Sequence, residues 1–340
     1  MRRLRAPVED RPRRIGFLLI AGFAMMSHAA ALEPLRAANT ISGRVLYEWR
    51  HLTIDGAPAA ASAGIAVPAD LALEEAGGLD VLMVVAGGNP AAFDHRPTFA
   101  RLRALAAAGV VIGGISGGAW LLARAGLLGG RRCTIHWEHG PALGEEFPDL
   151  HLERTLWVID RDRVTCAGGL AAFDMTVEMI ARQHGGELAA KVGEWYLHGR
   201  SRSGGDEQRT SLRERHGTPH PGLLEVLAAI EAEIETPPSR TDLARRAGVT
   251  VRQLDRLFAE HLGTTVGDHA IAVRLERARV LLRQTEMSVA EVAVACGFVS
   301  PGHFSRRYRA RFGRSPREDR RGPAEAALRG GIDRGGGVSL

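Results

Sequence analysis

The sequence predicts two domains of different class: an α/β sandwich with a mostly parallel sheet, followed by an all-α domain with two helix-turn-helix motifs. Three observations support this. The first 198 residues alternate short apolar runs with helical segments, a polar stretch rich in glycine, serine and arginine follows, and the remainder is helical. A chain of 340 residues with 45% hydrophobic and 24% charged residues is long enough for two folded domains, which excludes a disordered or fibrous protein.

The domain boundaries follow from these composition shifts. We expect a disordered extension over residues 1–13, an α/β domain over 14–198, a linker over 199–221, a helical domain over 222–321 and a disordered tail over 322–340. Residues 1–32 imitate a secretory signal, but Gly22, Ser27 and His28 interrupt the apolar stretch, which divides better into a strand and a helix. Since no apolar run reaches transmembrane length, we expect a cytoplasmic protein without membrane contact.

The first domain is expected to form a flavodoxin-like sandwich, because parallel strands buried on both faces are continuous apolar runs. The predicted strands cover residues 15–20, 48–54, 81–85, 110–115, 132–135, 155–159 and 163–166. The predicted helices cover residues 24–38, 98–108, 118–125, 138–147 and 171–183. Three isolated cysteines without C-x-x-C spacing indicate reduced thiols, so neither a metal site nor a cofactor is expected.

A run of small residues in the first domain has the pattern of a nucleophile elbow. The segment VVIGGISGGAW, residues 110–120, passes from an apolar strand through Ser116 into a helix, and its glycines permit a sharp turn. The N–H groups that follow, beginning with Gly117, can stabilise an oxyanion, and His136 is the candidate base. By themselves these residues predict a serine hydrolase or amidase.

The same region also suits binding without catalysis. Gly87 and Gly88 follow the strand predicted at 81–85 and can present backbone donors towards the elbow. Trp137 and Glu138 directly follow the histidine, although a tryptophan in the core and a solvated glutamate at a helix start are equally consistent with the pattern. The sequence therefore predicts a preformed ligand pocket lined by these residues.

The basic charge of the chain is concentrated near its C-terminus. Residues 239–321 contain 17 arginines against nine acidic residues, a net charge of +8, so the remaining residues carry −3. Because contacts to phosphates dominate nucleic-acid affinity, this asymmetry predicts a polyanion-binding module attached to a second domain.

Two units within the basic region repeat one design. In each, a short helix ends at a glycine, Gly248 or Gly297, and a tight turn leads into a second helix, at residues 251–262 or 301–312. A helix between the two units would hold the second helices about one turn of DNA apart, on the order of 34 Å. The side chains expected to reach bases or phosphates are Arg252, Gln253, Asp255, Arg256, His303, Arg306, Arg307 and Arg309.

The run RLERARVLLRQTEMSVAEVAVACGFVSPGHFSRRYRARFGRSPRE, residues 274–318, closely resembles the signature of AraC-type transcriptional regulators. The similarity extends back to about Ser239 and implies that the two second helices are recognition helices. Two positions depart from the family pattern. His269 stands where an aromatic residue is usual. Pro301 and Gly302 offer no side-chain donors at the start of the second recognition helix, residues 301–312.

Residues 14–198 resemble the PfpI-type branch of the class I glutamine-amidotransferase-like fold, joined to an AraC domain as in regulators of the GlxA type. The similar segments are ALEPLRAAN (31–39), GGISGGAWLLARAGLL (113–128), TIHWE (134–138) and TCAGGLAAFDM (165–175). In active members the elbow residue is a cysteine supported by an acid. Here the elbow residue is Ser116, Ser27 stands where the acid is expected, and only His136 matches, so the resemblance implies a catalytically degenerate domain.

The sequence thus predicts a sequence-specific transcriptional regulator, an activator rather than a repressor, whose first domain senses a small molecule. Similar regulators respond to nitrogenous metabolites such as arginine, carnitine or glycine betaine, and Trp137 with Glu138 would suit a cationic amine. The expected partners are promoter DNA, RNA polymerase and a second copy of the chain in a homodimer. Two alternatives stay open: an enzyme that uses Ser116 and His136, and a first domain that only oligomerises.

Overall fold

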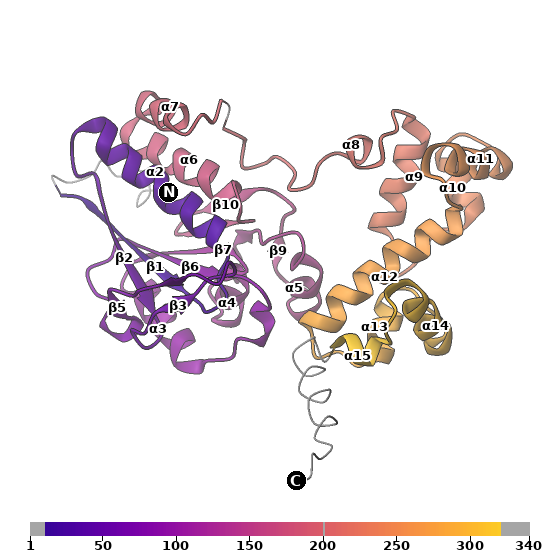
Figure 1. Cartoon of the computed structure of the whole chain (residues 1–340), viewed down its shortest axis with the longest axis horizontal. Helices are drawn as coiled ribbons and strands as arrows, with labels where there is room; N and C mark the ends of the chain where they lie inside the picture. Colours follow the sequence, from indigo (N-terminus) through magenta and orange to yellow (C-terminus); the bar gives the residue numbers. More distant parts are fainter. Residues whose placement is uncertain (1–10, 200, 321–340) are drawn as a thin grey trace, which may run out of the picture. The chain divides into compact units, whose positions relative to one another are not determined.

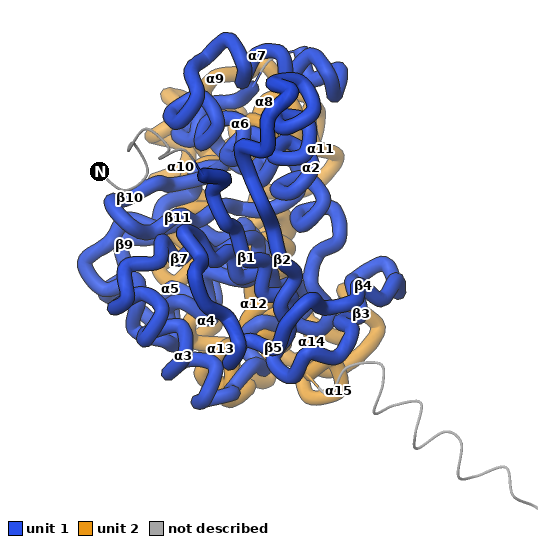
Figure 2. Tube along the Cα trace, turned by 90° about the vertical axis from the view of Figure 1, so that its left-hand side faces the viewer, with its two compact units in different colours: residues 1–208 blue, residues 209–340 orange. Residues whose placement is uncertain are grey.

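The computed structural model describes residues 11–199 and 201–320 and divides into two compact units, residues 1–208 and 209–340 (Figure 2). This division lies inside the segment expected as a linker. The expected tail, and the expected extension up to residue 10, lie outside the described residues. Residues 11–13 are described: Arg11 donates to both carboxylate oxygens of Asp80 at 2.9 and 2.8 Å, and Arg13 begins the first strand. In the described ranges no helix is long and apolar enough to cross a bilayer.

Unit 1 contains a seven-stranded sheet in the order β10-β11-β7-β6-β1-β2-β5. Its strands are β1 (Arg13–Leu19), β2 (Tyr47–Thr53), β5 (Leu71–Ala72), β6 (Val81–Ala86), β7 (Val111–Ser116), β10 (Trp157–Asp160) and β11 (Arg163–Cys166). Neighbouring strands are parallel except β10 and β11, which form an antiparallel pair at one edge. The mostly parallel sheet predicted from the apolar runs is confirmed, and every residue of β6 and β7 is buried.

Short strands and 3-10 turns complete the unit. They are β3 (Ala59–Ala60) with β4 (Ala66–Val67), β8 (Arg132–Cys133) with β9 (His151–Leu152), η1 (Leu73–Glu75) and η2 (Pro90–Ala92). Of these the sequence predicted only β8. Strands of two residues carry no periodicity of their own and form because distant segments meet.

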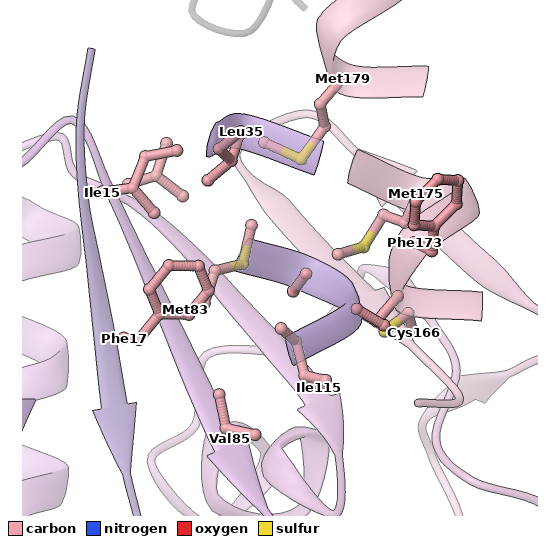
Figure 3. Close-up of a cluster of buried hydrophobic side chains, with 14 of the residues drawn as sticks. Ile15, Phe17, Leu35, Met83, Val85, Ile115, Cys166, Phe173, Met175 and Met179 are labelled. Carbon is pink, nitrogen blue, oxygen red and sulfur yellow. The ribbon is translucent and has the colours of Figure 1, made fainter. Parts of the chain in front are cut away.

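Helices cover both faces of the sheet. Figure 1 shows α2 (Met25–Ser42), α6 (Ala171–His184) and α7 (Gly186–Trp195) on one face, with α3 (Arg96–Ala107) and α4 (Gly118–Arg124) on the other; α5 (Gly140–Glu146) follows β8. In the core under the first layer, the side chains of Ile15 and Met83 from the strands lie near Leu35 and Met175 from the helices (Figure 3).

The helix α4 approaches the sheet unusually closely. A methyl group on Gly118 would lie 2.0 Å from the carbonyl oxygen of Val84, and one on Gly114 would lie 2.6 Å from the backbone nitrogen of Ala119. Only glycine leaves room for such contact between backbones. The chain therefore turns directly from β7 into α4, and Ser116 at the turn has a φ of 57°.

Unit 2 is entirely helical in its described part. Its helices are α8 (Leu212–His216), α9 (Pro221–Ala232), α10 (Arg240–Arg246), α11 (Val251–Leu262), α12 (Val266–Gln284), α13 (Val289–Ala295), α14 (Pro301–Phe312) and α15 (Pro316–Arg320). Hydroxyl caps begin several of them: Thr250 Oγ1 accepts from the Gln253 N–H at 3.3 Å, and Ser288 Oγ accepts from the Glu291 N–H at 3.2 Å. The expected linker includes α8.

The two helix-turn-helix motifs are α10–α11 and α13–α14. Gly248 and Gly297 adopt positive φ values of 67° and 72° at the two turns. Arg274 on α12 holds the second turn, because its guanidinium donates to the Cys296 carbonyl at 2.7 Å and lies 4.1 Å from the centre of the Phe298 ring. The turns therefore have a defined geometry from which α11 and α14 project.

The close approach of α4 leads to a stability prediction. Gly118→Ala should lower the free energy of unfolding of unit 1 by about 2 kcal/mol or more, because the added methyl overlaps the Val84 carbonyl. Gly144→Ala on α5 is the matched control: nothing lies within 4 Å of its added methyl, and alanine favours a helix by about 0.5–1 kcal/mol over glycine.

All five tryptophans, at positions 49, 120, 137, 157 and 195, belong to unit 1, so urea unfolding followed by tryptophan fluorescence measures this unit specifically. Equal midpoints for Gly118→Ala and Gly144→Ala would contradict the packing argument.

Candidate nucleic-acid interface and ligand site

The exposed faces of α11 and α14 carry the side chains that the sequence placed at the DNA. Leu254 and Phe258 of α11, and Phe304 and Tyr308 of α14, are fully buried and fix which face of each helix points outwards. Among the described residues, the side chains of Arg252, Arg306 and Arg309 make no hydrogen bond or ion pair. His303 lies at the start of α14, with its ring centre 6.1 Å from that of Phe298.

The other side chains of α11 that were predicted to contact DNA make contacts within the protein. The carboxamide oxygen of Gln253 accepts from the Thr250 N–H at 2.8 Å and from its hydroxyl at 2.9 Å, which completes a capping box. Asp255 is paired with Arg240 of α10. Arg256 lies 3.6 Å from Glu260, one turn along α11. These bonds leave only the NH2 group of Gln253 for a base edge, which excludes a bidentate contact to adenine, so on this helix Arg252 and Arg256 are the better placed candidates.

On α14, Arg307 is directed towards α12. Its guanidinium donates to Asp268 at 2.6 Å, and this hydrogen bond lowers the pKa of that carboxyl. Arg311, which the sequence did not single out, makes a similar bond to Glu276 of α12 at 2.8 Å. The two pairs tie the recognition helix to its neighbour and leave His303, Arg306 and Arg309 facing outwards.

A buried carboxylate anchors the last helix of this unit. Asp319 is 1% exposed and accepts from Arg279 at 3.0 Å, Arg283 at 2.6 Å and the Tyr308 hydroxyl at 2.7 Å. Burial raises the pKa of Asp319, but the hydrogen bonds from Arg283 and Tyr308 outweigh it, so the pKa lies below its ordinary value. This network holds α14 and α15 on α12.

The elbow of unit 1 lies at the carboxyl edge of the parallel strands. Ser116 is paired in register with Ala86, so Gly87 follows immediately beside the elbow and packs against the turn after β1. A methyl group on Gly168 would lie 2.7 Å from both the Ser116 Cβ and the Ser27 hydroxyl. The structure therefore brings together Ser116, Gly117, Gly87 and Ser27, from three strand ends.

The hydrogen bonds of the elbow do not form a nucleophile–base pair. The Gly117 N–H, predicted as an oxyanion donor, donates to the Ala86 carbonyl at 3.0 Å. The Ser27 hydroxyl accepts from the Gly169 N–H at 2.7 Å. In the described part of the chain, no hydrogen bond joins the Ser116 hydroxyl to the His136 ring.

His136, Trp137 and Glu138 form a second cluster, beyond the end of β8. The Thr134 N–H donates to the Thr165 hydroxyl of β11 at 2.9 Å, which places this cluster near the carboxyl end of a strand next to β7. The His136 side chain is 31% exposed, and its Nδ1 lies 3.9 Å from a Glu138 oxygen. Burial and then His139 lower the pKa of His136 more than Glu138 raises it, so the ring is neutral at pH 7.

A histidine pair that the sequence did not indicate joins α2 to β2. His28, next to Ser27, and His51 of β2 face each other with their Nε2 atoms 3.1 Å apart, and the rings of Phe17 and Phe23 pack edge-on against His28. Burial, and then His51, lower the pKa of His28 to about 4. The sequence showed only a polar residue in an apolar stretch. Among the described residues no group of three or more potential ligands could hold a metal ion.

Comparisons with known families agree with this division into two units. A model of the DJ-1/PfpI family matches residues 13–182, and a helix-turn-helix domain model matches residues 243–322. The HTH-type transcriptional regulator GlxA of Rhizobium meliloti is 46% identical over 309 residues, which cover 91% of this chain and 95% of that protein. The HTH-type transcriptional regulator CdhR of Pseudomonas aeruginosa is 45% identical and covers 89% of this chain and 90% of its own.

Two solved structures resemble the chain. An AraC family transcriptional regulator from Pseudomonas putida is 30% identical with a TM-score of 0.50, and covers 54% of this chain and all of its own. A ThiJ/PfpI family protein from Pseudomonas syringae, at 19% identity and a TM-score of 0.50, covers 77% of this chain and 90% of its own and shares the fold. The predicted α/β class of unit 1 is confirmed.

The histidine pair leads to a pH prediction. Because folding lowers the pKa of His28 from 6.5 to about 4, its neutral form stabilises unit 1 above pH 6.5, and that stability is lost as the pH falls towards 4. The loss should be on the order of 3 kcal/mol. Urea unfolding by tryptophan fluorescence between pH 7 and 4 measures it. His28→Gln should make the measured decline smaller by about this amount, whereas His151→Gln, at an exposed position, should leave it unchanged; an unchanged acid profile in His28→Gln would refute the assignment.

Proposed function

The chain belongs to the HTH-type transcriptional regulators that join a DJ-1/PfpI-family domain to an AraC-type DNA-binding domain, and from this membership we propose a role for each of its two units. Unit 2 binds promoter DNA through α11 and α14. Unit 1 senses a small nitrogenous metabolite near the Ser116 elbow and does not catalyse a reaction.

The observation that carries the DNA-binding role is the pair of recognition helices with outward-facing guanidinium groups. Arg252 on α11, and Arg306 and Arg309 on α14, make no hydrogen bond or ion pair among the described residues, whereas nearby arginines are used in ion pairs. A guanidinium held on a rigid helix can donate two parallel hydrogen bonds to a guanine edge or neutralise a phosphate.

The ligand site is proposed at the switch point of the sheet. The strand order reverses between β1 and β6, and ligands of open α/β sheets bind outside the carboxyl ends of the strands at such a point. Ser116, Ser27 and the backbone of Gly87 and Gly88 line this edge, and His136, Trp137 and Glu138 lie beyond the neighbouring strand. Indole and carboxylate groups together favour a cationic amine.

Three features support a non-catalytic elbow. Among the residues that the structure describes, the Ser116 hydroxyl has no hydrogen-bonded base, the first oxyanion donor is already bonded to Ala86, and a serine stands at the position of the supporting acid. A serine hydroxyl is a weak nucleophile at neutral pH without a base to accept its proton. Binding without turnover is therefore the proposed role.

We further propose that the protein acts in the cytoplasm as a homodimer and activates transcription through contact with RNA polymerase. A homodimer would double the DNA contacts of one chain and match a two-fold related operator. Ligand control requires that the metabolite binds one arrangement of the protein better than another.

Fluorescence anisotropy of the full chain with DNA from its own upstream region, at several stated salt concentrations and with excess nonspecific competitor, tests the DNA-binding role. Arg306→Ala and Arg252→Ala should each weaken specific binding by about 1–3 kcal/mol if the side chain contacts a base. Arg213→Ala on α8 removes the same charge outside the recognition helices and should have little effect. Equal affinity for specific and competitor DNA in the parent chain would reject the proposal.

Ser116→Ala distinguishes the sensor from the hydrolase. The variant should keep a ligand-dependent transcriptional response: loss of one hydroxyl at the site can change ligand affinity, but switching does not depend on a nucleophile. A reporter fused to the upstream promoter, measured with and without arginine, carnitine or glycine betaine, gives the readout. Release of an amide or ester product by the parent chain, abolished in Ser116→Ala, would establish the enzyme instead.

A further inference from the structure

The polar segment after α7 is fastened to unit 1 by a buried carboxylate. Asp174 on α6 is 1% exposed, and one of its oxygens accepts from His198 Nε2 at 2.9 Å and from the Arg202 N–H at 3.1 Å. The other oxygen accepts from Arg202 Nε at 2.9 Å. A buried carboxylate without partners is strongly unfavourable, so these residues complete the fold of unit 1.

Residues 203–208, here called the strap, then run along the edge of the sheet. The carbonyls of Gly204 and Asp206 accept from the N–H groups of Trp157 at 3.3 Å and Leu156 at 3.0 Å, and Thr155 forms an antiparallel bridge with Glu207. A methyl group on Gly204 would lie 2.7 Å from the indole ring of Trp157, so the ring lies directly against the glycine. The strap is an irregular edge strand beside β10.

The strap ends at Gln208, whose side chain enters the region of His136. Its amide nitrogen lies 2.9 Å from the Thr134 hydroxyl, 2.9 Å from the Ile135 carbonyl and 2.8 Å from the Thr155 carbonyl. Two of these are carbonyl oxygens, which only accept, so the nitrogen rather than the oxygen of the amide must face them. The Gln208 oxygen is buried without a hydrogen bond among the described residues, which makes this attachment less favourable than a fully satisfied one.

We propose that the strap is a conformational device that transmits occupancy of the ligand site to the linker. Gln208 binds the carbonyl of Ile135, the residue before His136, and is followed by Arg209, the first residue of unit 2. A ligand that shifts His136 shifts this carbonyl and so changes the free energy with which the strap is attached. This inference rests on the sensing role proposed above.

The device extends into unit 2 at the other end of the linker. Arg215 on α8 makes a bidentate pair with Glu231 on α9, at 2.7 and 2.9 Å, and Arg209 lies 3.9 Å from the same carboxylate. The chain is therefore fastened on both sides of the Gln208–Arg209 peptide bond. When Gln208 detaches from unit 1, the unattached segment between the contacts in unit 1 and the Glu231 pair becomes longer. By thermodynamic linkage, detachment of Gln208 changes the ligand affinity by the same factor as ligand binding changes the detachment equilibrium.

Hydrogen exchange of the full chain, without DNA or ligand, tests this coupling. Gln208→Ala and Gln208→Glu should speed exchange of the Leu156 and Trp157 amides at least fivefold, since these donate to the strap. They should also change exchange of the His139 and Gly140 amides, which donate to the His136 carbonyl at 2.8 and 3.2 Å. Glu207→Ala, one residue away on the exposed side of the strap, should change neither, and peptides from α2 and α6 should report an intact fold in every variant.

The reciprocal substitution decides the proposal. His136→Ala should alter exchange of the Leu156 and Trp157 amides, because coupling acts equally in both directions. The proposal is overturned if the Gln208 variants change exchange only at Leu156 and Trp157 and the His136 variant only at His139 and Gly140. The strap is then a passive attachment, even when the chain binds promoter DNA. If the two respond to each other but the chain fails to bind its promoter, the coupling stands and the proposed regulatory function falls.

Discussion

The contact of α4 with the backbone of β6 and β7 is the constraint on which the α/β unit depends. Two glycines without side chains, Gly114 and Gly118, allow the helix to begin directly against the sheet, and the chain must then reverse within Ser116 at a positive φ. The reversal places the serine at the carboxyl edge, beside the point where the strand order changes direction. The location proposed for the ligand site thus follows from packing, whether or not the residue at the turn can react.

Arginine has two separate uses in the helical unit. Some guanidinium groups join helices, as Arg279 and Arg283 do at Asp319, and as Arg307 and Arg311 do along α12. Planar groups with several donors suit such bridges. Others, such as Arg252 and Arg306, make no ion pair among the described residues and supply the positive field that attracts DNA. The bridging arginines also add to the net charge where they outnumber their carboxylates, because Asp319 alone accepts from both Arg279 and Arg283.

Local signals were sufficient to predict the longer strands of the sheet and both helix-turn-helix motifs, because apolar runs and tight glycine turns act within a few residues, but two-residue strands such as β5 gave no such signal. Predicting the use of each polar side chain was harder. The sequence predicted Gln253 as a base contact, but in the structure its carboxamide oxygen caps α11 at Thr250, which leaves only its NH2 group for DNA. The His28–His51 pair and the contacts of Gln208 join residues far apart in the sequence, so no pattern along the chain could reveal them.

The contacts of the buried Asp174 carboxylate show that the α/β unit extends beyond the residues that its family model matches. A model of the DJ-1/PfpI family matches this part of the chain up to residue 182, but the Asp174 carboxylate on α6 accepts hydrogen bonds from residues 198 and 202. The segment that folds as one body is therefore longer than the segment that the family model matches. Removing residues 198–202 would leave this carboxylate buried without these partners, so the α/β unit depends on the peptide that leads to the DNA-binding unit.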